Sequence, residues 1–304
     1  MAKGIGIRYS MKGLRALETE RSESGLSITR IAAAPIHEDA GSFLARHGFE
    51  ADTPVAVSLG PGDFLSVYMI REENMDDKDM ESHLKWEVQQ KMISEQFEYN
   101  YDFVAGNSAA YMFAGRKALI NSLKNLFSQV ITDVEPVALL NGCEGAGEID
   151  LETHHGVSLL ISTEAEGISS IVLHDGNPAA VESFPLQLSE YAEKMPGLDF
   201  DGSEKNDSEN SRQFVKYIGS SVNRLTSRGE DKKKPTPQRL ILAGGGVYLD
   251  DLAEQIEREI GISTSVSNPF RSLKVDFAVE KSPLESFGAA FTTCFGLALR
   301  AMEG

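Results

Sequence analysis

The sequence predicts a two-lobed α/β protein, and three features of its strand and helix pattern lead to this fold class. First, alternating apolar residues on both sides of a short turn predict a β-hairpin over residues 4–18. Second, residues 157–173 repeat this pattern, so each half of the chain begins with a hairpin. Third, the capping box Ser282-Pro-Leu-Glu285 opens a final helix over residues 283–302. With 304 residues, the chain is long enough for each lobe to have its own core.

A composition shift at about residues 141–156 divides the chain into these two lobes. We therefore expect the first lobe at residues 1–153 and the second lobe at residues 154–304. In the second lobe, residues 199–210 are acidic, polar and poor in aliphatic side chains, which predicts a loop.

A small α/β subdomain is expected to be inserted into the first lobe at about residues 52–115. Its predicted elements are a second hairpin with strands at 55–59 and 64–70, a helix capped by Asp76 or Asp77, and strands at 99–104 and 109–114. The hairpin is inferred from alternating residues on either side of a Gly-Pro-Gly turn at 60–62.

The helix of this subdomain carries two apolar stripes. One stripe consists of four residues that recur every four positions, Met80, Leu84, Val88 and Met92. Trp86 and Ile93 are seven positions apart and lie on a different face of the helix. The first stripe can pack on the subdomain's own strands. The second is either further core, which is the commoner case, or a surface for a partner.

Three glycines, Gly244, Gly245 and Gly246, follow the apolar segment 239–243 and precede an acidic amphipathic segment. An apolar run that enters glycines and leaves into a helix predicts a strand–turn–helix unit. Its turn allows another backbone or a ligand to approach closely. Such turns are common after buried strands, so this motif alone does not identify a ligand.

Composition argues against several functions. The net charge of −17 and the pI of about 4.8 predict a surface that repels nucleic acid and anionic lipid head groups. The basic run at 232–234 is interpreted as a solvated charge run. No stretch approaches the roughly twenty apolar residues that span a bilayer, and the N-terminus does not resemble a signal peptide. We therefore expect a cytoplasmic protein.

The cysteines and histidines predict no metal centre and no catalytic group. Cys143 and Cys294 are far apart in the sequence, within segments that look like helix interiors, so a disulfide or a zinc site is not expected. The adjacent pair His154-His155 points apart too readily to bind a metal well, and the other histidines fall in separate segments. No nucleophile–base pair with an orienting acid can be proposed.

Four segments, in collinear order over most of the chain, resemble the PilM family of actin-like proteins from type IV pilus assembly and related type II secretion systems. They are residues 79–90 with their Trp-Glu helix, residues 133–140 with a Val-Glu-Pro motif, residues 242–246 together with Asn268-Pro-Phe270, and residues 295–300 of the final helix. The resemblance implies an actin-like fold, with duplicated ribonuclease H-like mixed sheets and an inserted small subdomain. It also implies a cytoplasmic scaffold in a pilus or secretion assembly.

The residues that bind Mg²⁺ and phosphate in this fold are missing from both hairpins. Actin-like ATPases begin with an Asp-x-Gly hairpin, whose carboxylate organises Mg²⁺ and whose glycine lets backbone amides reach the phosphates. The matching positions here are Gly6 and Arg8, and those of the second hairpin are about Ser162 and Glu164. A glutamate beside a triphosphate adds like-charge repulsion. The resemblance therefore implies no ATPase activity, and weak ATP binding or none.

Only the glycines at 244–246 remain, as a vestigial adenosine loop, so no cofactor is expected. Two alternatives stay open. A functioning ATPase or sugar kinase of the same fold needs a pair of phosphate-binding carboxylates. Asp102, Asp133 and Glu135 are the candidates, in positions flanking predicted elements where an exposed carboxylate is the ordinary interpretation. The surviving glycines also allow a switch that binds nucleotide without hydrolysing it.

The resemblance further implies a partner, namely the cytoplasmic tail of a PilN-like inner-membrane protein, received in a groove beside the small subdomain. An extended tail needs an apolar slot and backbone partners. The residues expected to line the slot are Trp86, Ile93, Phe97, Tyr99 and Tyr101. The alternative is that these side chains form the core of the subdomain. Other assembly proteins are further expected partners, without nucleic acid and without direct insertion into the membrane.

Overall fold

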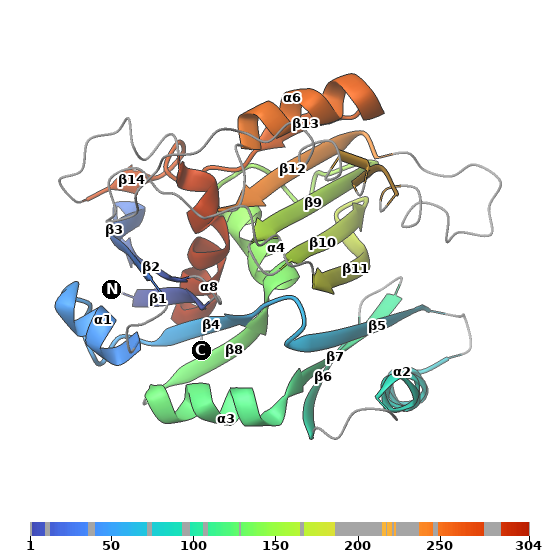
Figure 1. Cartoon of the computed structure of the whole chain (residues 1–304), viewed down its shortest axis with the longest axis horizontal. Coiled ribbons are helices and arrows are strands. Elements are labelled where there is room, and N and C mark those ends of the chain that lie inside the picture. Colours follow the sequence, from blue (N-terminus) through green and yellow to red (C-terminus); the bar gives the residue numbers. More distant parts are fainter. Residues whose placement is uncertain are drawn as a thin grey trace.

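The computed structural model describes residues 2–9, 13–35, 40–71, 75–92, 98–105, 109–127, 129–164, 167–185, 215–216, 218–220, 222, 237–245, 249–276 and 287–303. Within them the chain forms three β-sheets with helices beside and between them (Figure 1). Several predictions fall outside the described residues: the acidic loop at 199–210, the basic run at 232–234, the capping box at 282–285, and the residues Ile93, Phe97 and Gly246.

A six-stranded mixed sheet forms the first lobe, with the strand order β14-β3-β2-β1-β4-β8. Its strands are β1 (Ala2–Tyr9), β2 (Gly13–Ser22), β3 (Gly25–Pro35), β4 (Val55–Leu59), β8 (Val130–Val134) and β14 (Lys274–Val275). β1 and β2 pair antiparallel over their whole shared length, which confirms the predicted opening hairpin. Two helices, α1 (Ala40–Arg46) and α3 (Lys117–Leu126), contribute buried side chains to the core of this sheet.

The predicted hairpin of residues 55–59 and 64–70 is wrong. β4 lies between β1 and β8 and runs parallel to both, whereas β5 (Phe64–Ile70) pairs with a strand of a separate sheet. All five residues of β4 are buried, as expected for a central parallel strand covered on both faces. Alternation around a Gly-Pro-Gly turn does not reveal whether two strands pair with each other or enter different sheets. The subdomain sheet therefore begins at β5, after β4.

A three-stranded antiparallel sheet, ordered β5-β7-β6, forms the subdomain together with one helix. The remaining elements are α2 (Asp77–Lys91), β6 (Tyr99–Ala105) and β7 (Ala109–Arg116). The Asp76 side chain accepts a hydrogen bond from the backbone N of Asp79 at 2.8 Å, which confirms the helix N-cap. The predicted apolar face is also confirmed, because Met80, Leu84 and Val88 are fully buried against the sheet.

The second lobe is built on a five-stranded mixed sheet with the order β11-β10-β9-β12-β13. Its strands are β9 (Val157–Glu164), β10 (Gly167–His174), β11 (Asn177–Pro185), β12 (Arg239–Gly244) and β13 (Ser263–Val266). β9 and β10 pair antiparallel, which confirms the second predicted hairpin. The helix α6 (Leu249–Ile260) follows β12 and packs Leu252 and Ile256 into the core of this sheet, as the strand–turn–helix pattern predicts.

Two helices, α4 (Glu135–Gly145) and α8 (Thr292–Glu303), lie between the two large sheets, and the short 3-10 turn η1 (Gly288–Phe291) precedes α8 (Figure 1). Their close approach depends on glycine, because a Cβ on Gly296 would lie 1.9 Å from the carbonyl oxygen of Ala138. Gly6 on β1 makes room for α8 in the same way, since its Cβ would lie 1.8 Å from the carbonyl oxygen of Cys294. Gly6 therefore serves helix packing.

The two cysteines behave as small apolar residues. Cys143 lies in α4 and Cys294 in α8, and both are buried and free. Within the described part of the chain, no helix has both the length and the apolar character needed to cross a membrane. The described histidines, cysteines and carboxylates also form no group of three or more that could hold a metal ion.

Candidate functional site

Four charged side chains meet between the two opening hairpins and are almost completely buried. Arg8 on β1 is 1% exposed, and its Nε lies 3.2 Å from Oε1 of Glu164 and 3.4 Å from Oε1 of Glu135. Arg15 on β2 pairs with Glu164 Oε2 through one nitrogen and donates to the carbonyl oxygen of Ala290 at 2.9 Å through another. We call Arg8, Arg15, Glu135 and Glu164 the interlobe ion-pair cluster.

Hydroxyl groups of the second lobe donate hydrogen bonds to the carboxylate of Glu135. Ser162 on β9 donates to Glu135 Oε1 at 2.7 Å, and Ser169 on β10 donates to Oε2 at 3.3 Å. Glu135 also lies in the first turn of α4, where the helix dipole favours a negative charge. Both of its carboxylate oxygens are therefore hydrogen-bonded although the residue is fully buried.

The cluster joins elements of both lobes. The arginines come from the first hairpin, Glu164 and the two serines come from the second, and Glu135 comes from the helix between the sheets. Two cations and two anions balance, so the buried site carries no net charge. Removing one partner of a buried ion pair leaves an uncompensated buried charge, which is strongly destabilising.

This arrangement corrects one expectation drawn from the sequence. Glu135 was expected as an exposed carboxylate beside a helix start, but it is fully buried. The carboxylate of Glu164, which was expected to repel phosphate, is engaged by Arg8 and Arg15. The sequence contained one sign of this pairing, because an arginine within an apolar strand needs a buried carboxylate as its partner. The sequence does not reveal which carboxylate this is, because the partners lie far from Arg8 along the chain.

The glycine-rich turn also has a structural explanation in this site. Gly244 ends β12 with φ at 105°, and a Cβ there would lie 2.1 Å from the carbonyl oxygen of Thr163. A Cβ on Gly245 would lie 2.5 Å from Nη1 of Arg15, so the lack of a side chain at this position leaves room for the cluster. Gly244 is thus required by close packing against the Thr163 backbone, whether or not a nucleotide binds, and Gly245 leaves space for the end of the Arg15 side chain.

Gly244→Ala is expected to lower the free energy of unfolding by about 1–3 kcal/mol more than Gly147→Ala. Both glycines have positive φ, but a Cβ on Gly147 would meet nothing within 4 Å. The comparison therefore separates the clash with Thr163 from the backbone strain that both variants share. Urea unfolding of both variants measures the two changes in the free energy of unfolding. Equal decreases in the two variants would show that the β12 turn relaxes without a clash.

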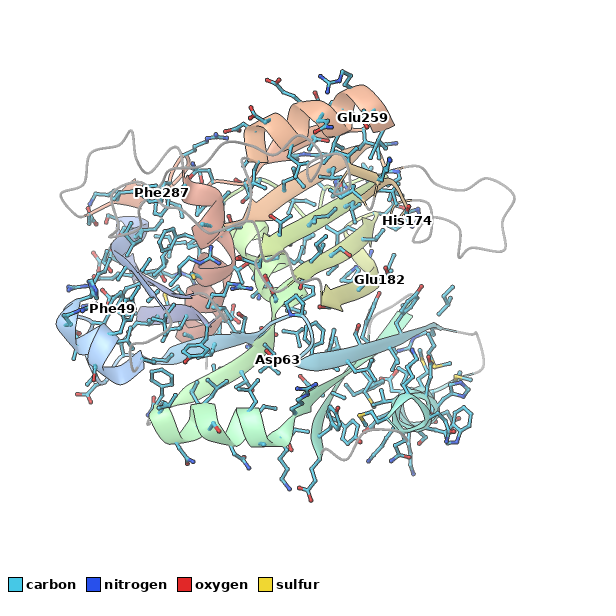
Figure 2. The ribbon with its side chains drawn as sticks, in the orientation of Figure 1. Phe49, Asp63, His174, Glu182, Glu259 and Phe287 are labelled. Atoms are coloured by element: carbon cyan, nitrogen blue, oxygen red, sulfur yellow. The ribbon has the colours of Figure 1, made fainter. Side chains whose placement is uncertain are left out.

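Asp63, labelled in Figure 2, lies on the turn that leads from β4 to the subdomain. Burial raises the pKa of Asp63, while the positive charges of Arg116 and Arg8 lower it and the negative charge of Glu135 raises it. Asp63 is therefore within electrostatic reach of the cluster. The junction between the first lobe and the subdomain thus lies next to the interlobe site.

The residues predicted to bind a partner divide into surface and core. Trp86 on α2 is 57% exposed, and its ring lies 6.3 Å from that of His83. Tyr101 on β6 is 38% exposed, with Nζ of Lys85 5.7 Å from its ring centroid. Tyr99 is half-buried and packs on the subdomain core, as the core alternative anticipated. We call the exposed residues Trp86 and Tyr101, together with Lys85 that contacts the Tyr101 ring, the aromatic surface.

A groove that the sequence analysis missed runs along β5. Its volume is about 530 Å³, and it is lined by every residue of β5, by Glu87 and Lys91 of α2, and by residues 181–183 of β11. β5 is the terminal strand of the subdomain sheet, and β11 is the terminal strand of the second-lobe sheet. We call this feature the β5 groove. The sequence contained one sign of this groove, because β5 contains neither a charged residue nor a proline.

Asp133 lies on β8, the terminal strand of the first-lobe sheet, and was also expected to be an exposed carboxylate. Burial raises the pKa of Asp133 to about 6, against the lowering effects of a hydrogen bond from the Val134 backbone N and of Arg300 on α8. Asp102 on β6 adds a smaller raising effect through its negative charge. The structure thus brings Asp102 and Asp133 near each other, but it does not place them in the interlobe cluster.

Asp133→Asn is expected to stabilise the protein above about pH 6. A carboxyl with a raised folded-state pKa retains its proton in the folded protein but loses it in the unfolded chain between pH 3.8 and about 6. The destabilisation caused by Asp133 is therefore absent below pH 3.8 and complete above about pH 6, where it amounts to about 3 kcal/mol at most. Urea unfolding from about pH 4 to pH 8 measures this, with the exposed Asp52→Asn as control. A difference between Asp133→Asn and wild type that does not depend on pH would contradict it.

Comparison with known proteins identifies the fold. A family model of the type IV pilus assembly protein PilM matches residues 218–302. A chain of the solved PilM-PilN type IV pilus biogenesis complex matches with a TM-score of 0.73 and 20% identity, and the match covers 99% of both chains. The fold is the actin fold in its PilM-like form.

Other solved structures show how widely this fold is shared. A Bacteroides thetaiotaomicron protein with an actin-like ATPase fold and unknown function matches with a TM-score of 0.53 and 11% identity, over 90% of this chain and 93% of the other. The inorganic polyphosphate/ATP-glucomannokinase of Arthrobacter sp. strain KM matches with a TM-score of 0.50 and 14% identity, over 99% and 98%. The predicted actin-like fold class is confirmed, and the matched structures include an enzyme.

Proposed function

We propose that this protein is a cytoplasmic scaffold of a type IV pilus or type II secretion-like assembly, and that it works without ATP hydrolysis. The PilM-like fold supports the role in assembly. The interlobe ion-pair cluster is the main observation in favour of a protein that does not hydrolyse ATP. Its side chains stand where an actin-fold ATPase needs groups that bind Mg²⁺ and phosphate.

The cluster is poorly suited to a bound triphosphate. Phosphates in this fold belong between the two hairpins, and there Arg8 and Glu164 pair with each other. A triphosphate would have to separate Glu164 from both arginines, or place its own charges beside Glu135 and Glu164. Each missing charge-assisted hydrogen bond to phosphate is worth roughly 1.5–3 kcal/mol. Since about 1.4 kcal/mol is a factor of ten, losing two weakens binding by two orders of magnitude or more.

The cluster also suits a scaffold, because it fixes the position of the lobes. In a nucleotide-driven actin-like protein, the ligand between the lobes controls their closure. Here two arginines of one lobe and a glutamate of the other make that connection within the chain. The protein therefore presents one surface to its partners whether or not nucleotide is present.

We further propose that a PilN-like inner-membrane protein holds this chain at the membrane through its cytoplasmic tail. A protein of the same fold was solved in a complex named for PilM and PilN. The aromatic surface offers the tail an anchor, because Trp86 is a large exposed side chain on the far side of α2 from its sheet. A net charge of −17 opposes direct contact with nucleic acid or an anionic membrane.

The alternative function is an ATP-binding conformational switch or an ATPase of the same fold. Its support is the match to an ATP-glucomannokinase and the retention of Gly244 and Gly245. Titration of the protein with ATP, with and without Mg²⁺, together with a phosphate-release assay, separates the scaffold, the switch and the ATPase. The scaffold binds nucleotide weakly or not at all, the switch binds it without hydrolysis, and the ATPase binds and hydrolyses it.

A further inference from the structure

Two terminal strands of different sheets face each other where the subdomain meets the second lobe. β5 ends the subdomain sheet and β11 ends the second-lobe sheet, and both line the β5 groove (Figure 1). The two strands are in contact but belong to separate sheets, because β5 pairs with β7 and β11 pairs with β10. The subdomain can therefore leave the second lobe without breaking a backbone ladder.

Side-chain hydroxyls of the subdomain hold this contact together. Ser66 on β5 donates a hydrogen bond to the carbonyl oxygen of Val181 on β11 at 3.3 Å. Tyr111 on β7 donates through its hydroxyl to the carbonyl oxygen of Pro178, also on β11. Both acceptors are backbone carbonyls of a terminal strand, and such groups need a partner where water is excluded. The subdomain supplies these partners, so it covers part of the edge of the second-lobe sheet.

An aromatic stack accompanies these hydrogen bonds on the inner face of the subdomain. The rings of Tyr68 and Tyr111 are stacked with their centroids 6.0 Å apart, and Phe113 stacks on Tyr111 at 6.4 Å. Tyr111 is buried in the same core as Val181 of β11. Burial raises the pKa of the Tyr111 hydroxyl well above its usual range, so the hydroxyl stays protonated and remains a donor at neutral pH.

The connections of the subdomain to the first lobe have the arrangement of a hinge. The chain crosses between the two parts only just before β5 and just after β7. These crossings are joined, since the backbone N of Arg116 donates to the carbonyl oxygen of Asp63 at 3.2 Å. β5 begins at Phe64 beside the crossings, and its register with β7 places Tyr68 opposite Tyr111 toward the other end. The hinge and the contact with β11 thus lie toward opposite ends of one strand pair.

We propose that the subdomain is a hinged strap, which the hydroxyls of Tyr111 and Ser66 hold closed on the edge of β11. The strap turns about the two crossings beside Asp63, where a few residues absorb the backbone rotation. When closed, it joins the two lobes at a second place besides the interlobe ion-pair cluster. It also covers β5, whose edge carries neither a charge nor a proline to prevent pairing with another chain. This inference does not depend on the role in pilus assembly.

Hydrogen exchange of the full chain, measured by mass spectrometry, tests the strap because it detects rare openings. The double variant Tyr111→Phe/Ser66→Ala removes both hydroxyls and keeps the aromatic ring. Opening of the strap should become at least about fivefold more frequent, since each lost hydrogen bond shifts the equilibrium by a modest factor. Residues 64–70 and 177–185 are expected to exchange faster by the same factor, whereas residues 239–244 of β12 should exchange at an unchanged rate.

The matched control removes two hydroxyls that lie elsewhere. Tyr9→Phe/Ser82→Ala changes an exposed tyrosine on β1 and an exposed serine on α2, and should leave exchange in β5 and β11 unchanged. Ser66→Ala alone should accelerate the same two strands by a smaller factor, and it provides the test if the double variant does not fold. Acceleration of only one of the two strands would indicate fraying of that strand. That result, unchanged exchange in both strands, or equal acceleration in β12 would overturn the proposal.

Discussion

Arg8→Met is expected to lower the free energy of unfolding by about 3–5 kcal/mol, which is the usual cost of removing one partner from a buried ion pair. Glu135 would lose its guanidinium partner and keep the hydroxyls of Ser162 and Ser169 as its described side-chain partners. Methionine fills a similar volume, so the loss reports charge more than packing. Urea unfolding at neutral pH measures the change.

Two comparisons make this result interpretable. Lys3→Met removes two solvent-accessible ion pairs, with Glu50 at 3.4 Å and with Glu20 at 3.9 Å, and should change stability by no more than about 1 kcal/mol. The double variant Arg8→Met/Glu135→Gln removes the orphaned charge and should recover part of the loss. If Arg8→Met costs no more than Lys3→Met, the cluster does not hold the two lobes together.

Trp86→Ala is expected to weaken binding of the PilN-like tail by at least about 2 kcal/mol, roughly thirtyfold, without changing the melting temperature. The indole is 57% exposed on a helix whose opposite face supplies the buried core, so its removal leaves the fold intact. Its exposure makes it available as an anchor for an apolar side chain of the tail. Anisotropy of the labelled tail measures the affinity.

Matched variants distinguish an anchor from a core residue. Leu126→Ala truncates another exposed apolar side chain, on α3, and should affect neither affinity nor stability. Tyr99→Ala should lower stability, because Tyr99 packs on the subdomain core. Unchanged tail affinity in Trp86→Ala would show that the aromatic surface is not the anchor, and a lower melting temperature would assign Trp86 to the core.

Local signals explain what could be predicted of the fold. The two opening hairpins were predictable because each is a pair of neighbouring strands joined by a short turn. The N-cap at Asp76 and the buried stripe of α2 were predictable from spacing within one helix. The pairing of β4 and β5 was not predictable, because strands that are neighbours in the sequence can each pair with strands from distant parts of the chain. For β4 those partners are β1 and β8.

The candidate site was only partly predictable for the same reason. Arg8 and Glu164 were recognised as departures from a phosphate site, but their pairing depends on a topology that brings β1 beside β9 and α4. Glu135 looked like an ordinary helix-start carboxylate, although burial makes it central. Trp86 could be core or surface from its spacing alone, and only its exposed fraction decides between them.

Calorimetric titration with ATP, with and without Mg²⁺, tests the central claim most directly. The claim is that the interlobe ion-pair cluster replaces nucleotide in a PilM-like scaffold. The Arthrobacter ATP-glucomannokinase in the same buffer is the positive control. Our account predicts no saturable heat at micromolar ATP in either condition, because Arg8 and Glu164 occupy the place of the phosphate-binding groups. Micromolar binding that requires Mg²⁺ would contradict it.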